Sequence, residues 1–296
     1  LVRLTTQGRR EAENLANISR QLRVEGYTQP LCADIHFNAN VADVAACHTE
    51  KVRINPGNYV DPARTFKHLE YTDEQYAQEL EKIEERLTTF IDLCKEHHTA
   101  VRIGVNHGSL SDRIMSRYGD TPEGIVESCM EFLRIFRKHN FDDVVISIKA
   151  SNTVVMVRSV RLLVAEMDRE DMHYPLHLGV TEAGEGEDGR IKSAVGIGAL
   201  LADGIGDTIR VSLTEAPENE IPVAQQLVEQ FSSRPGRFEV LHPERYSPTE
   251  FRRRSRVQTP VVRGESMEGF RILESTSGNP TAELRAAILN LEGDEP

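Results

Sequence analysis

Four cationic side chains stand near the ends of short runs rich in β-branched residues. In a β-strand, residues two apart project from the same face, so each cation shares a face with a polar neighbour. These same-face pairs are Arg53 with Asn55, Arg102 with Asn106, Ser147 with Lys149, and Arg210 with Ser212. If the runs are parallel strands of one barrel, their carboxyl ends surround a single pocket, and the four cations should converge there.

Four cations in one concavity repel one another unless an anion lies between them. Arginine suits bidentate recognition of phosphate, and lysine acts as a compact point charge. We therefore expect a small substrate with several negative oxygens, and a diphosphate fits better than a single carboxylate. The alternative is a buried ionic layer in which these cations pair with Asp34, Glu182 and other inward acids.

Acid-base candidates lie in the same predicted strands or directly after them. They are Asp34, His36, His177, Thr181 and Glu182, of which His177 is the best candidate. His36 could equally be a hydrogen-bonded histidine of the barrel wall. Two histidines with Asp and Glu could also bind a divalent metal, but they come from distant strands without a local ligand motif, so we expect no metal site.

Lys149 permits two chemical interpretations. A lysine on a barrel strand can form a Schiff base, as in an aldolase, and cationic neighbours could depress its pKa. The same neighbours also explain it as a phosphate ligand, which is the interpretation we prefer.

The elements that must position these residues alternate along the chain, because each short strand pattern is followed by a longer helical one. The predicted strands are 1–5, 31–37, 52–55, 101–106, 144–149, 176–181 and 209–213. Such alternation predicts an α/β fold of the (β/α)8 TIM type. Only seven units are visible, so we expect the first strand to precede Leu1 and the chain to be a fragment. An open doubly wound sheet is the alternative, but no G-x-G-x-x-G follows the first strand.

Several helices and loops are predicted between these strands. Residues 72–96 and 121–139 have the periodicity of amphipathic helices, and Pro122 stands at a conventional helix opening. The glycine-rich residues 183–186 are predicted to form a flexible loop that could act as a lid. A helix over 193–201 follows, and Lys192 and Ser193 at its start could cap it or contact a phosphate.

Composition excludes several classes of function. The 296 residues include 35 Lys and Arg against 47 Asp and Glu, a net charge of −12, which argues against a nucleic-acid-binding surface. No apolar run is long enough for a membrane span, and no targeting segment is visible, so we expect a cytoplasmic protein. The four cysteines, Cys32, Cys47, Cys94 and Cys129, are scattered and form no C-x-x-C pair. We expect reduced thiols.

The strand and helix pattern stops after residue 231. We therefore predict a barrel over 1–231, followed over 232–296 by a linker and the start of a second domain. The tail contains one predicted strand at 259–263, a predicted helix at 281–290 and a basic run at 252–254, which is typical of a solvated surface.

Six sequence blocks together resemble the 4-hydroxy-3-methylbut-2-enyl diphosphate synthase family. They are ADIHF (33–37), KVRINPGN (51–58), RIGVNHGSL (102–110), KAS (149–151), HLGVTEAG (177–184) and GIGDTIRVS (204–212). The resemblance implies a barrel that binds 2-C-methyl-D-erythritol 2,4-cyclodiphosphate. It also implies a separate domain with a [4Fe-4S] cluster on three Cys and one Glu, reduced by ferredoxin or flavodoxin.

Carried over by these blocks, the resemblance assigns two groups of residues. Arg53, Arg102, Lys149, Arg210 and Ser212 would hold the diphosphate, and Asp34, Asn55, Asn106, His177 and Glu182 would line the rest of the substrate. The sequence departs from the family in lacking the first strand and any cysteine-rich cluster domain. We therefore expect this chain alone to be inactive, with the tail resembling the start of the extra domain of the large form of the enzyme.

Other functions stay open at this point. A dihydropteroate-synthase-like transferase or a Schiff-base aldolase could use the same barrel, and a non-catalytic binding module is a third hypothesis. The sequence does not decide whether the protein forms a homodimer.

Overall fold

The computed structural model describes residues 1–35, 38–61 and 70–232, together with four two-residue strands between 262 and 275. The chain divides into two compact units, Leu1–Thr249 and Glu250–Pro296. The candidate functional residues of the described chain lie in the first unit.

In the described residues of the first unit, seven parallel strands follow one another. They are β1 (Val2–Thr6), β2 (Leu31–Ile35), β3 (Lys51–Ile54), β4 (Ala100–Asn106), β5 (Val144–Lys149), β6 (His177–Leu178) and β7 (Thr208–Ile209). The first five form one sheet in chain order, β6 pairs with β7, and an isolated bridge from Ile146 to Leu176 connects the two sheets. Among the described residues, no pairing joins β7 to β1.

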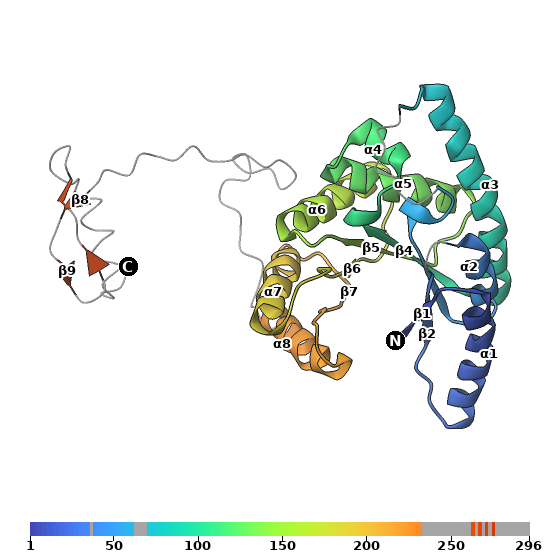
Figure 1. Cartoon of the computed structure of the whole chain (residues 1–296), viewed down its shortest axis with the longest axis horizontal. Coiled ribbons are helices and arrows are strands. Elements are labelled where there is room, and N and C mark those ends of the chain that lie inside the picture. Colours follow the sequence, from blue (N-terminus) through green and yellow to red (C-terminus); the bar gives the residue numbers. More distant parts are fainter. Residues whose placement is uncertain are drawn as a thin grey trace. The chain divides into compact units, whose positions relative to one another are not determined.

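Helices lie outside the strands and cover them (Figure 1). They are α1 (Arg9–Val24), α2 (Ala39–Ala46), α3 (Asp73–His97), α4 (Asp112–Tyr118), α5 (Pro122–Lys138), α6 (Thr153–Arg169), α7 (Gly186–Ala202) and α8 (Glu220–Ser232). Three short 3-10 helices, η1 (Pro56–Asn58), η2 (His107–Ser109) and η3 (Pro217–Asn219), lie in the loops that follow β3, β4 and β7. This arrangement is the predicted (β/α) barrel architecture.

The predicted helix boundaries of α3 and α5 are set by local capping. Thr72 and Gln75 form a capping box at the start of α3, and Thr121 accepts a hydrogen bond from Gly124 N at the start of α5. Pro122 occupies the first turn of α5, where its missing N–H is not needed. His98 ends α3 in the left-handed conformation at φ 56°.

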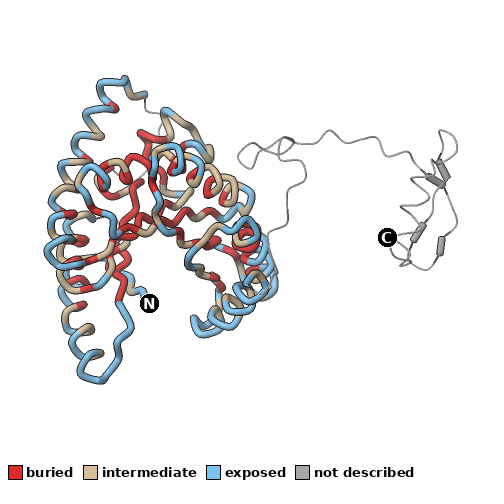
Figure 2. The backbone as a smooth tube through the Cα atoms, turned by 180° about the vertical axis from the view of Figure 1, so that it is seen from behind, coloured by how far each residue is buried: buried red, intermediate tan, exposed pale blue. Residues whose placement is uncertain are grey.

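Strand alternation decides which side chains face the helices and which face the barrel interior. Val52 and Ile54 of β3 are fully buried against the helical layer, whereas Arg53 between them faces a cavity. The helices supply the other half of this core, for example with Phe132 and Phe136 of α5. Figure 2 shows the result: β2, β4 and β5 are buried along most of their length, whereas the outer surfaces of the helices are exposed.

The prediction for the start of α7 was wrong. The helix begins at Gly186, with Glu185 as its N-cap, so Lys192 and Ser193 lie inside it and do not offer its N-terminus to a ligand. The early start of the helix is not evident from the sequence, because Gly189 lies in its second turn and glycine is a poor helix former. Gly189 is needed there since a Cβ would lie 2.6 Å from the carbonyl oxygen of Gly184. The regular strands β6 and β7 are also shorter than predicted.

The second unit contains two antiparallel strand pairs. β8 (Val262–Arg263) pairs with β11 (Glu274–Ser275), and β9 (Ser266–Met267) pairs with β10 (Phe270–Arg271). The predicted strand at 259–263 overlaps β8, and the predicted helix at 281–290 lies outside the described residues.

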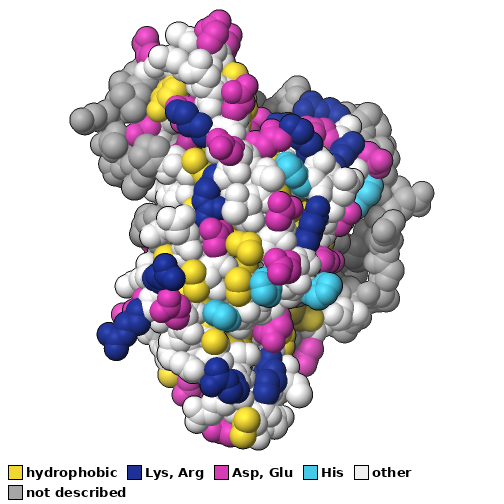
Figure 3. Space-filling model, turned by 90° about the vertical axis from the view of Figure 1, so that its right-hand side faces the viewer, with side chains coloured by type: hydrophobic (Ala, Val, Ile, Leu, Met, Phe, Trp, Pro, Cys, Tyr) yellow, Lys and Arg dark blue, Asp and Glu magenta, His cyan; other side chains and the backbone are white. Residues whose placement is uncertain are grey.

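The outer face formed by α1 to α3 carries interspersed cations and anions (Figure 3). This face shows no basic patch of the kind that a nucleic-acid backbone requires. In the described ranges, no helix is both long enough and apolar enough to cross a membrane.

Candidate functional site

A cavity of about 170 Å³ lies at the carboxyl ends of the strands. Five cationic side chains and one carboxylate line it, together with small and polar residues: Arg3, Arg53, Arg102, Lys149, Arg210, Asp34, Gly104, Val105, Asn106, Ser147, Val180, Thr181 and Ser212. The structure thus brings together the four predicted cations. We call this cavity the cationic pocket.

Strand register places like charges directly opposite one another. Arg53 of β3 is the register partner of Arg102 of β4, and Asp34 of β2 is the partner of Arg53. Like charges on neighbouring strands destabilise a sheet unless an opposite charge compensates them. Asp34 provides part of this compensation, since it accepts a hydrogen bond from Arg53 Nη1 at 3.0 Å and lies 3.5 Å from Arg3 Nε.

Gly104 allows Arg53 to cross β4. Arg53 Nη2 donates to the carbonyl oxygen of Gly104 at 2.8 Å, and a Cβ at position 104 would lie 3.1 Å from Arg53 Cζ and closer still to Nε. Any other residue would therefore push the guanidinium away. The missing side chain at position 104 of β4 therefore leaves the space that the Arg53 guanidinium occupies.

Arg102 is one of the most buried cations of the chain, with 6% of its surface exposed. Its Nη2 donates to Ser147 Oγ at 3.2 Å. Burial, followed by the charges of Arg53 and Arg3, lowers the pKa of Arg102 to about 10. Within the described part of the chain, the Nε atoms of both Arg53 and Arg102 are buried without a hydrogen-bond partner. Buried donors without a hydrogen-bond partner destabilise the fold, and an anion with several oxygens could accept hydrogen bonds from both Nε atoms.

Lys149 is the last residue of β5, and its side chain lies against a second glycine, Gly179. A Cβ at position 179 would be 3.0 Å from both Cε and Nζ of Lys149. Burial, followed by the charges of Arg102, Arg210, Arg3 and Arg53, lowers the pKa of this lysine well below its ordinary value.

Arg210 and Ser212 come from the segment that follows β7. Arg210 Nε pairs with Glu220 Oε2 at 3.4 Å, and the other oxygen of Glu220 accepts from Leu213 N at 3.1 Å. Glu220, the first residue of α8, therefore positions this segment at the edge of the pocket. Sequence inspection did not single out this glutamate.

Asn55 and Asn106 both cap the 3-10 turns after their strands. The side-chain oxygen of each accepts a hydrogen bond from a glycine amide, Gly57 N at 3.2 Å and Gly108 N at 3.3 Å. Asn55 also donates to Ser109 Oγ at 2.7 Å, which ties the loops after β3 and β4 together. Asn106 lines the pocket, whereas Asn55 supports the loop next to it.

His177 lies outside the lining residues, and its Nδ1 is 2.9 Å from Thr208 Oγ1. Its Nε2 is buried, and no described group forms a hydrogen bond with it. Burial, followed by the charge of Arg102, lowers the pKa of His177 to about 2. The imidazole is therefore neutral at ordinary pH, which fits a hydrogen-bonding role better than the donation of a proton.

Glu182 also lies outside the lining residues. It is exposed and has a left-handed backbone at φ 52° in the loop between β6 and α7. A positive φ is uncommon for a residue other than glycine. The backbone conformation of the loop therefore sets the direction of this side chain. His36 lies outside the described residues.

Arg3 is the cation that sequence reasoning missed. It lines the pocket from β1, and burial lowers its pKa. The two-residue rule applied to the strand at 1–5 would have placed Arg3 and Thr5 on the same face. Arg3 stands near the beginning of its strand, where the rule that barrel sites lie at the carboxyl ends gives no reason to expect a site residue.

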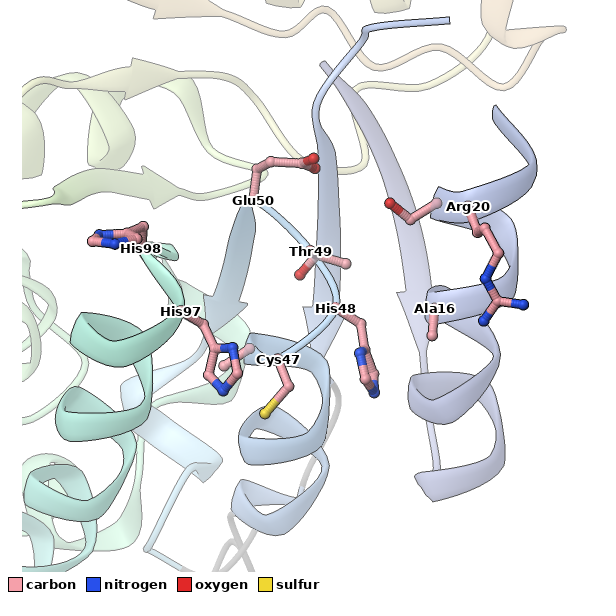
Figure 4. A pocket seen from close by; sticks show the side chains of 10 residues that line it. Ala16, Arg20, Cys47, His48, Thr49, Glu50, His97 and His98 are labelled. Carbon is pink, nitrogen blue, oxygen red and sulfur yellow. The ribbon is translucent and has the colours of Figure 1, made fainter. Parts of the chain in front are cut away.

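A larger cavity of about 390 Å³ lies near the opposite ends of the strands, beside the C-terminal ends of α2 and α3. Figure 4 shows that its histidines come from separate positions, with His48 after α2 and His97 and His98 at the end of α3. In the described residues, no three His, Cys, Asp or Glu side chains are grouped closely enough to hold a metal ion. Catalytic residues of barrels lie at the other face, so this cavity is not the candidate site.

The cysteines of the described chain do not fit an iron-sulfur cluster. Cys32, Cys94 and Cys129 are buried in different parts of the core, and Cys47 is partly exposed. Cluster coordination requires several thiolates around one position. In the part of the chain that the structure describes, these four thiols therefore do not form a cluster-binding site.

The fold and its lining residues define a (β/α) barrel with a cationic pocket. Residues 1–225 match the family model described as the GcpE TIM-barrel domain, and the chain belongs to this family. This match does not favour a dihydropteroate-synthase-like transferase, an aldolase or a non-catalytic module.

Curated relatives agree with this assignment. The chain is 68% identical over 278 residues to the 4-hydroxy-3-methylbut-2-en-1-yl diphosphate synthase (flavodoxin) of Phocaeicola vulgatus, which covers 90% of this chain and 45% of the relative. It is 73% identical over 233 residues to the enzyme of the same name from Parabacteroides distasonis, and this alignment covers 79% of this chain and 38% of the relative. The chloroplastic (ferredoxin) enzyme of Oryza sativa subsp. japonica is 58% identical to this chain over 227 residues. This alignment covers 76% of this chain and 30% of the relative. The chain thus spans less than half the length of these relatives.

Proposed function

We propose that this chain is the substrate-binding barrel of an enzyme of isoprenoid biosynthesis. The complete enzyme would reductively convert 2-C-methyl-D-erythritol 2,4-cyclodiphosphate to 4-hydroxy-3-methylbut-2-enyl diphosphate. The observation that carries the proposal is the cationic pocket, in which five cations and one carboxylate surround a cavity of about 170 Å³. A cyclic diphosphate supplies two negative charges and several acceptor oxygens to this excess of donors.

The residues divide into two proposed groups. Those that would hold the diphosphate are Arg53, Arg102, Lys149, Arg210 and Ser212, joined by Arg3. Those that would surround the remainder of the substrate are Asp34, Asn55, Asn106, His177 and Glu182. Asn55 would act by supporting the loop, and Glu182 would have to turn inward from its exposed position.

The redox components belong to the complete protein in this proposal. A [4Fe-4S] cluster would be held by residues outside this chain, and flavodoxin or ferredoxin would supply electrons in the cytoplasm. Relatives whose names specify flavodoxin or ferredoxin support the choice of donors. Residues 232–296 would be the linker and the start of an inserted domain. The alignment of 278 residues with the Phocaeicola relative is longer than the family match and supports this assignment.

Isothermal titration calorimetry of the 296-residue chain with the cyclodiphosphate tests the proposal. Arg53→Ala and Arg210→Ala should each weaken binding by roughly 10- to 150-fold, because each removes a charge-assisted hydrogen bond worth about 1.5–3 kcal/mol. Arg9→Ala, which removes an exposed arginine on α1, is the matched control and should bind normally. Unaltered affinity in both pocket variants would refute the site, and no binding by the unmodified chain would refute the function.

A further inference from the structure

Lys149 and Arg102 differ from the other three cations of the pocket, because neither has an ion-pair partner among the described residues. Asp34 contacts Arg53 and Arg3, and Glu220 pairs with Arg210. Among the described residues, no carboxylate forms an ion pair with Lys149. Its amine lies over Gly179, within the pocket.

Charged and titratable groups of the neighbouring strands lie in or beside the pocket that contains Lys149. Apart from Asp34 and the thiol of Cys32 on β2, these groups are cationic or neutral. They are Arg3 from β1, Lys51 and Arg53 from β3, Arg102 from β4, His177 from β6 and Arg210 after β7. Four guanidiniums therefore surround one amine. Arginine keeps its proton under almost all conditions, whereas a lysine that is crowded by positive charge can release its proton. Lys149 is the one group here that can relieve the repulsion by changing its charge.

We propose that Lys149 is the proton acceptor of this pocket: it is a neutral amine while the pocket holds no anion, and it becomes an ammonium when a cyclic diphosphate enters. The identity of the anion rests on the proposed function, but the neutral state of Lys149 in the empty pocket does not. The lowered pKa of this lysine, caused by burial and then by the four arginines, agrees with the geometry. Two negative charges beside the amine would reverse the Coulombic part of that effect.

Binding would then consume a proton from the solvent, which adds to the lone pair of Lys149 Nζ. The ligand itself takes up no proton near neutral pH. Each phosphorus of a cyclic diphosphate carries one strongly acidic oxygen, unlike a phosphate monoester with a second pKa of about 6. The occupied pocket therefore holds more protons than the empty one, so affinity must fall as pH rises. The expected slope is about tenfold per pH unit, between the lowered pKa of the empty pocket and the higher pKa of the occupied one.

Calorimetry in several buffers measures this proton directly. The observed heat of cyclodiphosphate binding is plotted against the ionisation enthalpy of the buffer at one pH, and the slope is the number of protons taken up. We expect about one proton for the unmodified chain and almost none for Lys149→Arg, which keeps a permanent charge. Binding by the unmodified chain without proton uptake would overturn the proposal. Uptake that persists in Lys149→Arg and disappears in His177→Gln would do the same, because the histidine would then be the acceptor.

A second measurement needs no ligand. The ¹³Cε resonance of Lys149, assigned by its loss in Lys149→Arg, should report a neutral amine at neutral pH in the 296-residue chain. An ammonium there would overturn the proposal whether or not the chain binds the cyclodiphosphate. Failure to bind would refute only the proposed function.

Discussion

Replacing Gly104 by alanine should disable Arg53 without removing any polar atom from the pocket. The added Cβ would lie 3.1 Å from Arg53 Cζ and closer to Nε than real Cβ contacts allow. The guanidinium would then have to give up its hydrogen bonds of 3.0 Å to Asp34 and 2.8 Å to the carbonyl oxygen of Gly104. The perturbation acts on one side chain through one methyl group.

Two magnitudes follow from this displacement. Overpacking in a filled site typically costs about 1–3 kcal/mol of the free energy of unfolding. Loss of the charge-assisted hydrogen bonds that Arg53 would make to a diphosphate costs about 1.5–3 kcal/mol of binding free energy, or roughly 10- to 150-fold in Kd.

Urea unfolding and calorimetric titration with the cyclodiphosphate measure these two effects. Gly108→Ala is the matched control, because the nearest atom to its added Cβ is Asn106 Oδ1 at 3.9 Å. The decisive comparison is Gly104→Ala in an Arg53→Ala background, where the methyl group should cause little further loss of affinity. An equal loss in both backgrounds, or normal affinity in the single variant, would refute the reasoning.

Two further predictions concern stability. Arg113→Met should lower the free energy of unfolding by about 3–5 kcal/mol in urea titrations, because the buried guanidinium pairs with Asp61 and Glu131 and its loss leaves both carboxylates uncompensated. Arg117→Met, which changes an exposed arginine, should lower the free energy of unfolding by only about 0–1 kcal/mol. Equal losses in the Arg113 and Arg117 variants would contradict this account. Burial, followed by the charge of Arg102, lowers the pKa of His177 from 6.5 to about 2, so between these values the unfolded state holds a proton that the folded state does not. Stability should therefore fall as pH drops below 6.5, by up to about 1.4 kcal/mol per pH unit from this group, and His177→Gln should reduce that slope in unfolding measured at several pH values.

Local pattern was sufficient to predict the class of fold and most of the cations. Strand alternation needs only neighbouring residues, so Arg53, Arg102, Lys149 and Arg210 could be placed on inward faces from the sequence. The ends of α3 and α5 were predictable for the same reason, since their caps involve residues only a few positions apart.

Some local signals led to an incorrect or incomplete assignment. The helix α7 begins before the predicted position, because Gly189 lies within the helix at a close packing contact and not in a turn. Asn55 shares the face of Arg53, but its amide is used in a cap and in a bond to Ser109. Facing the interior does not by itself make a residue a ligand.

By itself, the sequence determined a parallel barrel of βα units with a row of cations along its strand ends. Only the tertiary structure decided that Arg3 joins them, that Asp34 bridges two of the arginines, and that His177 is held neutral. These properties depend on groups that are distant in sequence and on the loss of water around them. A side chain's face follows from the geometry of its own strand, whereas its charge and its partners follow from the strands that pack beside it.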